Sequence, residues 1–350
     1  MELELFDPYS PDAAQIWNRV EPRSFFTSWG WIENWLACLP SDRTTHLAVL
    51  RDGDRIGTCL LGEVRVVRRG VIPVRSMHLN ATGTQRFDDV IIEYNGVNGA
   101  EPRLADLLAA MPHGCDELEL PGVRETSFGG LSTDGTGWDV EIEKRSPAYF
   151  VDLEAARSGY LAKLSSQTRS QIRRAQKAAG TLSVEVATDA AKAIEIYDEL
   201  CVLHIAQWRV RGHPGAFADP WLDRFHRRLI ATRFAAGEIQ LIRVRTGSAT
   251  LGCLYNFVWG DRVMQYQTGF RGSDDAREKP GYVCHTAAIE HCAREGLGVY
   301  DFLAGDHRYK RSLSTGNDTL VWCKVRRPRW RFRLEEQLVK LVRAVRSRSS

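Results

Sequence analysis

The sequence predicts an α+β fold made of two similar halves. Its 350 residues exceed what one hydrophobic core usually fills, so we expect two domains. Residues 47–61 and 241–255 each consist of an apolar strand, a turn at Gly53 or Gly247, and a second strand. The second half also orders strands first, then a helix, then a strand that delivers polar residues, which is typical of α+β domains.

The repeated hairpin carries a small irregularity. The offset between the copies is 194 residues at the turn and 195 residues beyond it, where Gly57 corresponds to Gly252. The second copy has therefore gained one residue. Turn glycines and alternating apolar residues also recur in unrelated hairpins, so a chance likeness stays open at this point.

Hydrophobic periodicity and turn residues set the other elements. In the first half they predict helices within 25–39 and at 102–111, and strands at 46–51, 56–67, 71–78, 117–120 and 138–144. In the second half they predict helices at 166–179, 189–210, 219–236 and 281–295, and strands at 239–246, 250–259, 262–270, 299–303 and 319–327. An amphipathic helix at 331–346 completes the chain.

Composition narrows the class of protein. With 43% hydrophobic and 26% charged residues, the chain is an ordinary globular one. No apolar run approaches the roughly 20 residues that cross a bilayer, and the start MELELFDPYS lacks the features of a secretory signal. We therefore expect a cytoplasmic protein without a transmembrane segment. The eight cysteines form no closely spaced pair, so we expect neither a metal site nor disulfides.

The net charge of +3 hides an asymmetry, since residues 324–350 carry +8 and residues 1–323 carry −5. We expect a first half at 1–155, a second half at 156–330 and a basic amphipathic helix at 331–350. That helix could bind an anionic partner, or it could pack its apolar face on the rest of the protein and leave its basic face in water. The oligomeric state is not indicated.

The strongest chemical signal lies in residues 299–313. A short strand delivers Asp301 and breaks at a glycine, and Asp306, Tyr309 and Lys310 follow closely. A carboxylate, a phenol and an ammonium at a strand end have the composition of a reaction site. A turn whose aspartate caps a helix and whose lysine is solvated would explain the same residues.

A second signal is the basic helix at 166–179. Arg169, Arg173 and Lys177 follow one another at four-residue spacing, and no acidic residue separates them. Like charges at this spacing destabilise an isolated helix, so the pattern favours an anionic ligand over a merely solvated surface.

Two further groups of residues are candidates for binding a substrate. His204, Trp208 and Arg211 share one face at the end of helix 189–210, although a packed histidine and a cation near the helix terminus would explain them as well. A long polar loop in the first half carries Asp88 and Asp89, which could hold an amine or a sugar hydroxyl.

Three of these segments resemble a known family. Residues 301–310 are similar to the D-F-x-x-G-D-x-x-Y-K segment of GNAT-fold acyltransferases related to the cellulose-biosynthesis (CelD-like) acetyltransferases. Fem-type relatives, which transfer amino acids from aminoacyl-tRNA, carry a related segment. Residues 164–174 resemble L-S-x-x-x-R-x-x-[IL]-R-R, and 203–212 resemble L-H-x-x-x-W-x-x-R-G. The resemblance implies tandem GNAT-like domains, each a mixed, mostly antiparallel sheet flanked by helices, with the acceptor side first and the donor side second.

The same family resemblance also bears on which activated donor the protein binds. GNAT enzymes hold the pyrophosphate of coenzyme A at a helix N-terminus with an R/Q-x-x-G-x-G/A segment, and this chain keeps Gly281 and Lys279 there. It lacks the paired glycines, and Pro280 removes a donor N–H. Both acyl-CoA and aminoacyl-tRNA therefore stay open. The expected cofactor-binding residues are Arg271, Arg277, Lys279, Gly281 and Tyr282.

The resemblance implies an N-acyltransferase with no permanently bound cofactor, which acts on an amine of a small-molecule, sugar or peptide acceptor. Asp301 or Asp306 would be the base or amine-binding group, Lys310 a cation over the developing charge, and Tyr309 a proton donor to the leaving group. The alternative is a non-catalytic GNAT-like module that binds RNA or an anionic surface through its basic helices.

Overall fold

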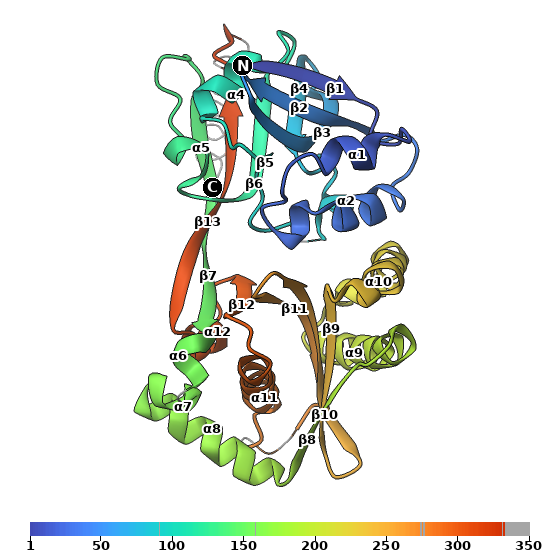
Figure 1. Ribbon diagram of the computed structural model, residues 1–350, viewed down its shortest axis with the longest axis vertical. Helices are drawn as coiled ribbons and strands as arrows, with labels where there is room; N and C mark the ends of the chain where they lie inside the picture. The colour runs from blue at the N-terminus through green and yellow to red at the C-terminus, as the bar shows by residue number, and fades with distance from the viewer. Residues whose placement is uncertain (91, 158, 274, 276, 331, 333–350) are drawn as a thin grey trace, which may run out of the picture. The chain divides into compact units, whose positions relative to one another are not determined.

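The computed structural model describes residues 1–90, 92–157, 159–273, 275, 277–330 and 332. The chain divides into two compact units (Figure 1). Unit 1 contains residues 1–29, residues 39–145 and the described residues from 320 on, and unit 2 contains residues 30–38 and 146–319. No helix in these described ranges is long and apolar enough to cross a membrane. Of the helix expected at 331–346, only residue 332 is among the described residues.

Unit 1 is built on a mixed sheet with the strand order β1-β2-β3-β4-β6-β13. Neighbouring strands are antiparallel, apart from the parallel pair β4 and β6. The strands are β1 (Glu2–Phe6), β2 (Thr44–Asp52), β3 (Arg55–Arg68), β4 (Ile72–Leu79), β6 (Glu117–Arg124) and part of β13 (Gly316–Arg326), with β5 (Asn98–Gly99) beside β3. Its helices are α1 (Ala13–Trp17), α3 (Gln85–Asp88), α4 (Leu104–Ala110) and α5 (Ser127–Gly130).

Unit 2 repeats this arrangement with the strand order β8-β9-β10-β11-β12-β7. The strands are β8 (Leu182–Val186), β9 (Ile239–Thr246), β10 (Ala249–Trp259), β11 (Arg262–Phe270), β12 (Val299–Ala304) and part of β7 (Asp139–Asp152). The helices are α6 (Leu153–Arg157), α7 (Tyr160–Lys163), α8 (Ser166–Ala179), α9 (Ala190–Val210), α10 (Pro220–Arg233), α11 (Pro280–Arg294) and α12 (Arg308–Leu313). α9 and α10 lie on one side of β9 to β11, and α11 lies on the other (Figure 1).

The two sheets agree in strand order and also in strand direction. In unit 2, as in unit 1, the fourth and fifth strands of the order, β11 and β12, form the parallel pair, and the other neighbours are antiparallel. The repeated hairpins are β2–β3 and β9–β10, which occupy the same place in each order. The α+β fold of two similar halves is therefore confirmed.

The residue gained in the second hairpin is a β-bulge. Leu50 pairs with Gly57 in unit 1, and Val244 pairs with Gly252 in unit 2, as the repeat requires. The register of β10 against β9 shifts between Thr250 and Gly252, which accommodates one extra residue in β10. The sequence offset of 195 beyond the turn thus has a structural cause.

The chain differs from the expected elements at several places. The strand expected to end at 144 continues as β7 to Asp152, whereas Arg145-Ser146-Pro147 suggests a break in the sequence. Pro147 lacks an N–H but still accepts a hydrogen bond at its carbonyl from Gly305 N, at 3.0 Å. The boundary expected after residue 155 falls inside α6, because unit 2 already begins with the later part of β7.

The helix expected within 25–39 is divided. A 3₁₀ turn at Phe25–Thr27 precedes α2 (Trp29–Leu36), most of which belongs to unit 2. There the buried Trp31 ring packs edge-on against Phe225 and Phe257, with centroids 5.1 and 5.5 Å apart. Aromatic burial on this scale explains why a short segment from the first half joins the second core.

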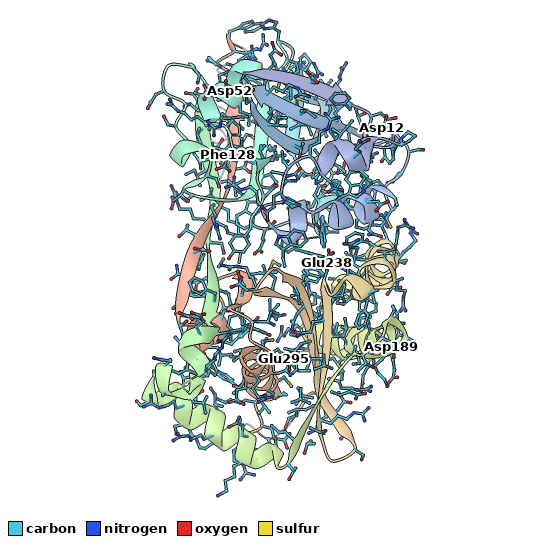
Figure 2. All side chains as sticks on the ribbon, viewed as in Figure 1. Asp12, Asp52, Phe128, Asp189, Glu238 and Glu295 are labelled. Atoms are coloured by element: carbon cyan, nitrogen blue, oxygen red, sulfur yellow. The ribbon has the colours of Figure 1, made fainter. Side chains whose placement is uncertain are left out.

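The long helices of unit 2 begin with side-chain caps. Asp189, labelled in Figure 2 at the start of α9, accepts a hydrogen bond from Lys192 N at 2.8 Å. Ser165 accepts one from Thr168 N at 3.2 Å at the start of α8. Each cap satisfies one of the free N–H groups of the first turn, so the predicted and observed helix starts agree closely.

Candidate active site

The parallel strands of each unit pair over only three residues and then separate. In unit 2 the last printed pair of β11 and β12 is Met264 with Asp301, and in unit 1 the last pair of β4 and β6 is His78 with Glu119. β11 nevertheless continues to Phe270. Backbone groups beyond the separation need other partners, so this place suits a ligand or an inserted segment.

In unit 1 the chain itself fills this place. The Asn95 side chain donates to the carbonyls of Leu79, at the end of β4, and of Pro121 in β6, both at 2.9 Å. Asn95 N also donates to Gly122 O at 3.1 Å, and Asn80 Nδ2 donates to Asn95 Oδ1 at 2.7 Å. The segment around Asn95 therefore bridges the two separated strands.

In unit 2 the corresponding strand ends are held from opposite sides. At the end of β11, the carbonyl of Thr268 is 3.0 Å from His204 Nδ1 on α9. At the end of β12, Lys310 Nζ donates to the carbonyls of Leu303 and Ala304, at 3.2 and 2.7 Å. In the described part of unit 2, the hydrogen bonds at these ends thus come from separate neighbours rather than from one bridging segment.

Asp301 is fully buried in β12 and has two firm contacts. Its Oδ2 forms an ion pair with Arg262 Nη1 at 2.5 Å, and its Oδ1 accepts from Leu303 N at 2.7 Å. Leu303 has a φ of 60°, an uncommon conformation for a bulky residue. The carboxylate of Asp301 therefore shapes the turn that follows β12.

Gly305 allows this turn to be tight. Its φ is 131°, and a Cβ there would lie 3.1 Å from the His307 ring and 3.3 Å from Lys310 Nζ. The Lys310 side chain, on α12, is buried at 7% exposure. Glycine thus brings a strand end, an ammonium and an imidazole together.

Three rings form a stack beside the strand ends. Tyr309 on α12 lies nearly parallel to His285 on α11, with centroids 5.2 Å and planes 14° apart, and to His307, at 6.0 Å and 19°. His285 also meets Phe270 of β11 and Phe302 of β12 edge-on, at 5.6 and 5.3 Å. The stack therefore joins α11 and α12 to both separating strands.

The ionisable groups of the stack are held neutral. Burial raises the pKa of Tyr309 to about 12, and no hydrogen bond joins its hydroxyl to another side chain in the described ranges. Burial and the nearby Lys310 charge lower the pKa of His285 to about 3. Burial, Lys310 and Arg211 also lower the pKa of His307, although Asp306 opposes them. Near neutral pH the stack is a phenol between two uncharged imidazoles.

Neither histidine was a sequence candidate. His285 lies in an apolar helix, where a histidine usually packs in the core, and its partner Tyr309 is 24 residues away along the chain. His307 follows a turn and belongs to no spaced pattern. Only the fold brings them to Tyr309.

Asp306 is the exposed carboxylate of this region. It forms an ion pair with Arg311 and accepts a hydrogen bond from the Tyr149 hydroxyl at 3.1 Å. The Arg311 hydrogen bond holds the pKa of Asp306 below its ordinary value. Asp306 is thus an accessible anion suited to contact with a positively charged amine.

The expected cofactor-binding residues surround the start of α11. Lys279, the N-cap, donates from Nζ to Gln171 Oε1 of α8 at 3.0 Å, and the Tyr282 hydroxyl lies 3.0 Å from Ser312 Oγ of α12. Gly281 lies beside the Phe270 ring. Arg271 and Arg277, in the preceding loop, form ion pairs with Glu278 and Asp275.

The expected substrate-binding residues of α8 and α9 differ in their surroundings. Arg169 Nη1 donates to Leu164 O at 2.7 Å, whereas Arg173 is exposed. His204 is buried, while the Arg211 guanidinium lies over the Trp208 ring at 5.3 Å. The Arg211–Trp208 pair therefore lies at the end of α9.

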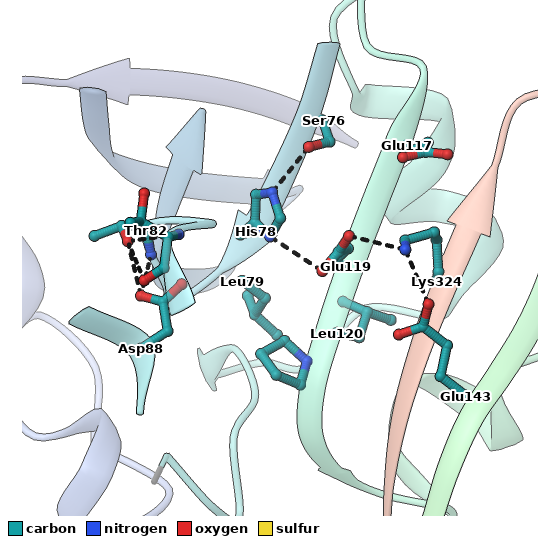
Figure 3. A network of polar contacts seen from close by, with 12 residues as sticks. Ser76, His78, Leu79, Thr82, Asp88, Glu117, Glu119, Leu120, Glu143 and Lys324 are labelled. Carbon is teal, nitrogen blue, oxygen red and sulfur yellow. Dashed lines mark hydrogen bonds and ion pairs between the residues drawn. The ribbon is translucent and has the colours of Figure 1, made fainter. Parts of the chain in front are cut away.

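The two acidic candidates of unit 1 also differ. Asp88 accepts from Thr82 N and Thr82 Oγ1 at 2.7 and 2.9 Å, so it holds the loop after β4 (Figure 3). Burial raises the pKa of Asp88. Asp89 is exposed.

A chain of ionisable side chains in contact lies beside them (Figure 3). His78 Nδ1 is 3.3 Å from Glu119, which is 3.2 Å from Lys324, and Lys324 is 2.9 Å from Glu143. Burial alone would raise the pKa of Glu119, but His78 and Lys324 lower it to about 2. These contacts link β4, β6, β13 and β7 within unit 1. Throughout the described residues, no group of three His, Cys, Asp or Glu side chains could hold a metal ion.

Comparison with known proteins places this geometry in a fold family. Residues 162–311 match the family model of the acetyltransferase (GNAT) domain, which lies within unit 2. FemX is 11% identical over 92% of this chain and 97% of its own, with a TM-score of 0.55. A comparison with curated proteins gave no match.

Two further solved structures are similar over nearly the whole chain. One is the C-terminal domain (DUF2156) of a putative lysylphosphatidylglycerol synthetase from Agrobacterium fabrum, 13% identical over 89% of each chain, with a TM-score of 0.52. The other is a conserved protein of unknown function from Bacteroides thetaiotaomicron, 11% identical over 93% of this chain and 99% of its own, with a TM-score of 0.55. At such identities these likenesses concern the fold alone. With the internal repeat, they agree with a fold of two similar GNAT-like domains, and unit 2 contains the stretch, residues 162–311, that matches the acetyltransferase (GNAT) domain.

Proposed function

We propose that the protein is an N-acyltransferase that moves an acyl or aminoacyl group from an activated donor to an amine, with the chemistry in unit 2. The observation that carries this proposal is the Tyr309 phenol. It is protonated, held between two neutral imidazoles, and located where β11 and β12 separate. The GNAT family match over residues 162–311 supports the class of reaction.

The proposed reaction needs two proton movements. The amine nitrogen attacks the carbonyl carbon of a thioester or ester, and the bond to the leaving sulfur or oxygen then breaks. Tyr309 gives its proton to the leaving group, and His307, neutral and exposed, accepts the proton that the amine loses. Transfer of that proton back to Tyr309 restores both groups, so no proton is consumed.

The other candidates then have supporting roles. Asp301 positions the turn after β12, and Lys310 holds the two carbonyls of that turn while adding positive charge near the developing oxyanion. Asp306 would attract the amine. Asp89, exposed in unit 1, stays a candidate for holding the acceptor.

Two donors fit this scheme. The start of α11 offers Gly281 and Lys279 to a pyrophosphate, but Pro280 removes one N–H. The fold likeness to a putative lysylphosphatidylglycerol synthetase supports an aminoacyl donor. Acyl-CoA and aminoacyl-tRNA are therefore tested side by side.

The test has two stages. The first measures thermal unfolding with increasing acetyl-CoA and, separately, with charged tRNA, since a ligand at 100 times its Kd stabilises the native state by about 2.7 kcal/mol. The second measures transfer from the protecting donor to a panel of amines. We expect saturable protection by one donor, retained in Tyr309→Phe, and product formation that this variant loses. Absence of protection by both donors, or product formation unchanged in the variant, would contradict the proposal.

A further inference from the structure

One surface of unit 2 differs from the rest in its charge. Five cations of α8 and the turn before it define what we call the α8 basic face: Lys163, Arg169, Arg173, Arg174 and Lys177. No ion pair joins any of them to a carboxylate within the described ranges. By contrast, Arg243 of the same unit forms ion pairs with three glutamates at 2.8 to 3.0 Å.

The α8 basic face is also hollowed. Ser166, Arg169, Ser170, Arg173, Arg174 and Lys177 line a shallow, open groove of about 440 Å³. From Ser166 to Lys177 the helix rises about 17 Å, at 1.5 Å per residue. This length exceeds a single pyrophosphate and suits a ligand with several phosphates in a row, to which the two serine hydroxyls can also donate.

A lipid surface and a nucleic-acid backbone both present several phosphates in a row, and the side chains of the groove distinguish between these two ligands. A helix that binds a lipid surface inserts apolar side chains among the lipids. In α8 the apolar side chains point inward, since Ile172 and Ala175 are fully buried in the core of unit 2. The groove thus offers cations and hydroxyls and nothing to insert, which favours a nucleic-acid backbone.

The groove is connected to the candidate active site. Gln171 of α8 accepts a hydrogen bond from Lys279, the N-cap of α11, and α11 carries His285 of the ring stack. Gln171 lies midway along α8 and outside the groove lining, so this contact packs the helix that carries the groove against the start of α11. All of these residues belong to the same unit.

We propose that the α8 basic face binds the phosphodiester backbone of RNA, as the docking surface for an aminoacyl-tRNA donor. This inference rests on the proposed acyl transfer, because it names the donor for that reaction. Arg173, Arg174 and Lys177 supply the phosphate contacts. Arg169 contributes charge while its Nη1 holds the turn before the helix.

The test measures binding of the full chain to an uncharged RNA hairpin of about 12 base pairs with a single-stranded 3′ end, from 50 to 300 mM salt. The variant Arg173→Gln/Arg174→Gln/Lys177→Gln leaves Arg169 in place. A matched control, Arg209→Gln/Arg228→Gln/Arg294→Gln, removes three exposed cations from α9, α10 and α11. Residues 331–350 are present in every protein, so their charge affects all measurements alike.

We expect the slope of log K against log salt to fall by about 2 to 3 in the α8 variant, or just under one per lost phosphate contact. Affinity at 50 mM salt should fall by at least about 10-fold, with unchanged thermal unfolding, whereas the control should bind within about 2-fold of wild type. Equal binding by the α8 variant would overturn the proposal. So would stronger α8-dependent binding to phosphatidylglycerol vesicles than to the hairpin.

The hairpin carries no acyl group, so this result does not depend on catalysis. Tyr309→Phe should bind it as wild type does. RNA binding through α8 without any transfer would contradict the proposed acyltransferase function and support the RNA-docking surface. Transfer from acetyl-CoA without RNA binding would support the acyltransferase function and contradict the RNA-docking surface.

Discussion

Replacing Tyr309 with phenylalanine removes one hydroxyl and keeps the ring stack. Because that hydroxyl bonds to no other side chain in the described ranges, the free energy of unfolding should change by less than about 0.5 kcal/mol. If the hydroxyl protonates the leaving group, turnover should fall about 10²- to 10⁴-fold, the usual contribution of general acid catalysis. Stopped-flow or endpoint detection of released thiol or deacylated tRNA measures this loss.

The pH dependence separates an acid from a base. With a pKa of about 12, Tyr309 is protonated in all but about one molecule in 10⁴ at pH 8. A proton donor is then fully competent at that pH, so the rate should not rise between pH 8 and 10 on account of Tyr309. A rate that climbs with pH in wild type and not in the variant would refute the acid role.

Tyr160 provides a matched control in the same unit. Its hydroxyl donates to Leu313 O at 2.6 Å, and Leu313 ends α12. Tyr160→Phe should therefore destabilise the protein by about 1 kcal/mol, the net value of a typical hydrogen bond, and leave turnover within about 3-fold. Loss of turnover in both variants with equal stability changes would show that Tyr309 is merely structural.

Three other perturbations test the surrounding structure. Arg262→Gln deprives the buried Asp301 carboxylate of its cation and should cost about 3 kcal/mol in urea denaturation, which Arg262→Gln/Asp301→Asn should partly restore. Gly305→Ala should cost about 1 to 3 kcal/mol through its positive φ and lower turnover at least 10-fold, as paired denaturation and rate measurements would show. The pKa of Glu119 is lowered from 4.5 to about 2, so its contribution, at most about 3 kcal/mol, is complete above pH 4.5 and lost as the pH falls towards 2. Glu119→Gln should flatten acid unfolding in that range, and an unchanged acid transition would contradict the assignment.

Long helices and strands could be predicted from the sequence because their hydrophobic periodicity extends over many residues. The helix at 166–179 and the strands at 239–246 and 262–270 have the predicted bounds. β1 and β8 do alternate polar and apolar residues, but each is only five residues long, and so short a pattern does not stand out from chance. The continuation of β7 was missed because its proline is tolerated through tertiary contacts.

For the candidate active site, the sequence likewise indicates residues that are close along the chain but not the partners that the fold brings to them. Asp301, Asp306, Tyr309 and Lys310 lie within ten residues, so the sequence could group them. Their partners come from elsewhere: Arg262 from β11, Tyr149 from β7 and His285 from α11. Whether a carboxylate is buried and paired, or exposed, depends on such contacts. For this reason the different roles of Asp301 and Asp306 follow from the fold and not from the motif.

The central claim is that the donor binds in unit 2, where β11 and β12 separate, and not at the equivalent place in unit 1, which the segment around Asn95 fills. Hydrogen–deuterium exchange with and without the protecting donor tests it most directly. We predict slower exchange at the amides of 265–270, 281–283 and 302–304, and no change at 78–80 and 119–123. Protection confined to the second group, with the first unaffected, would contradict the account.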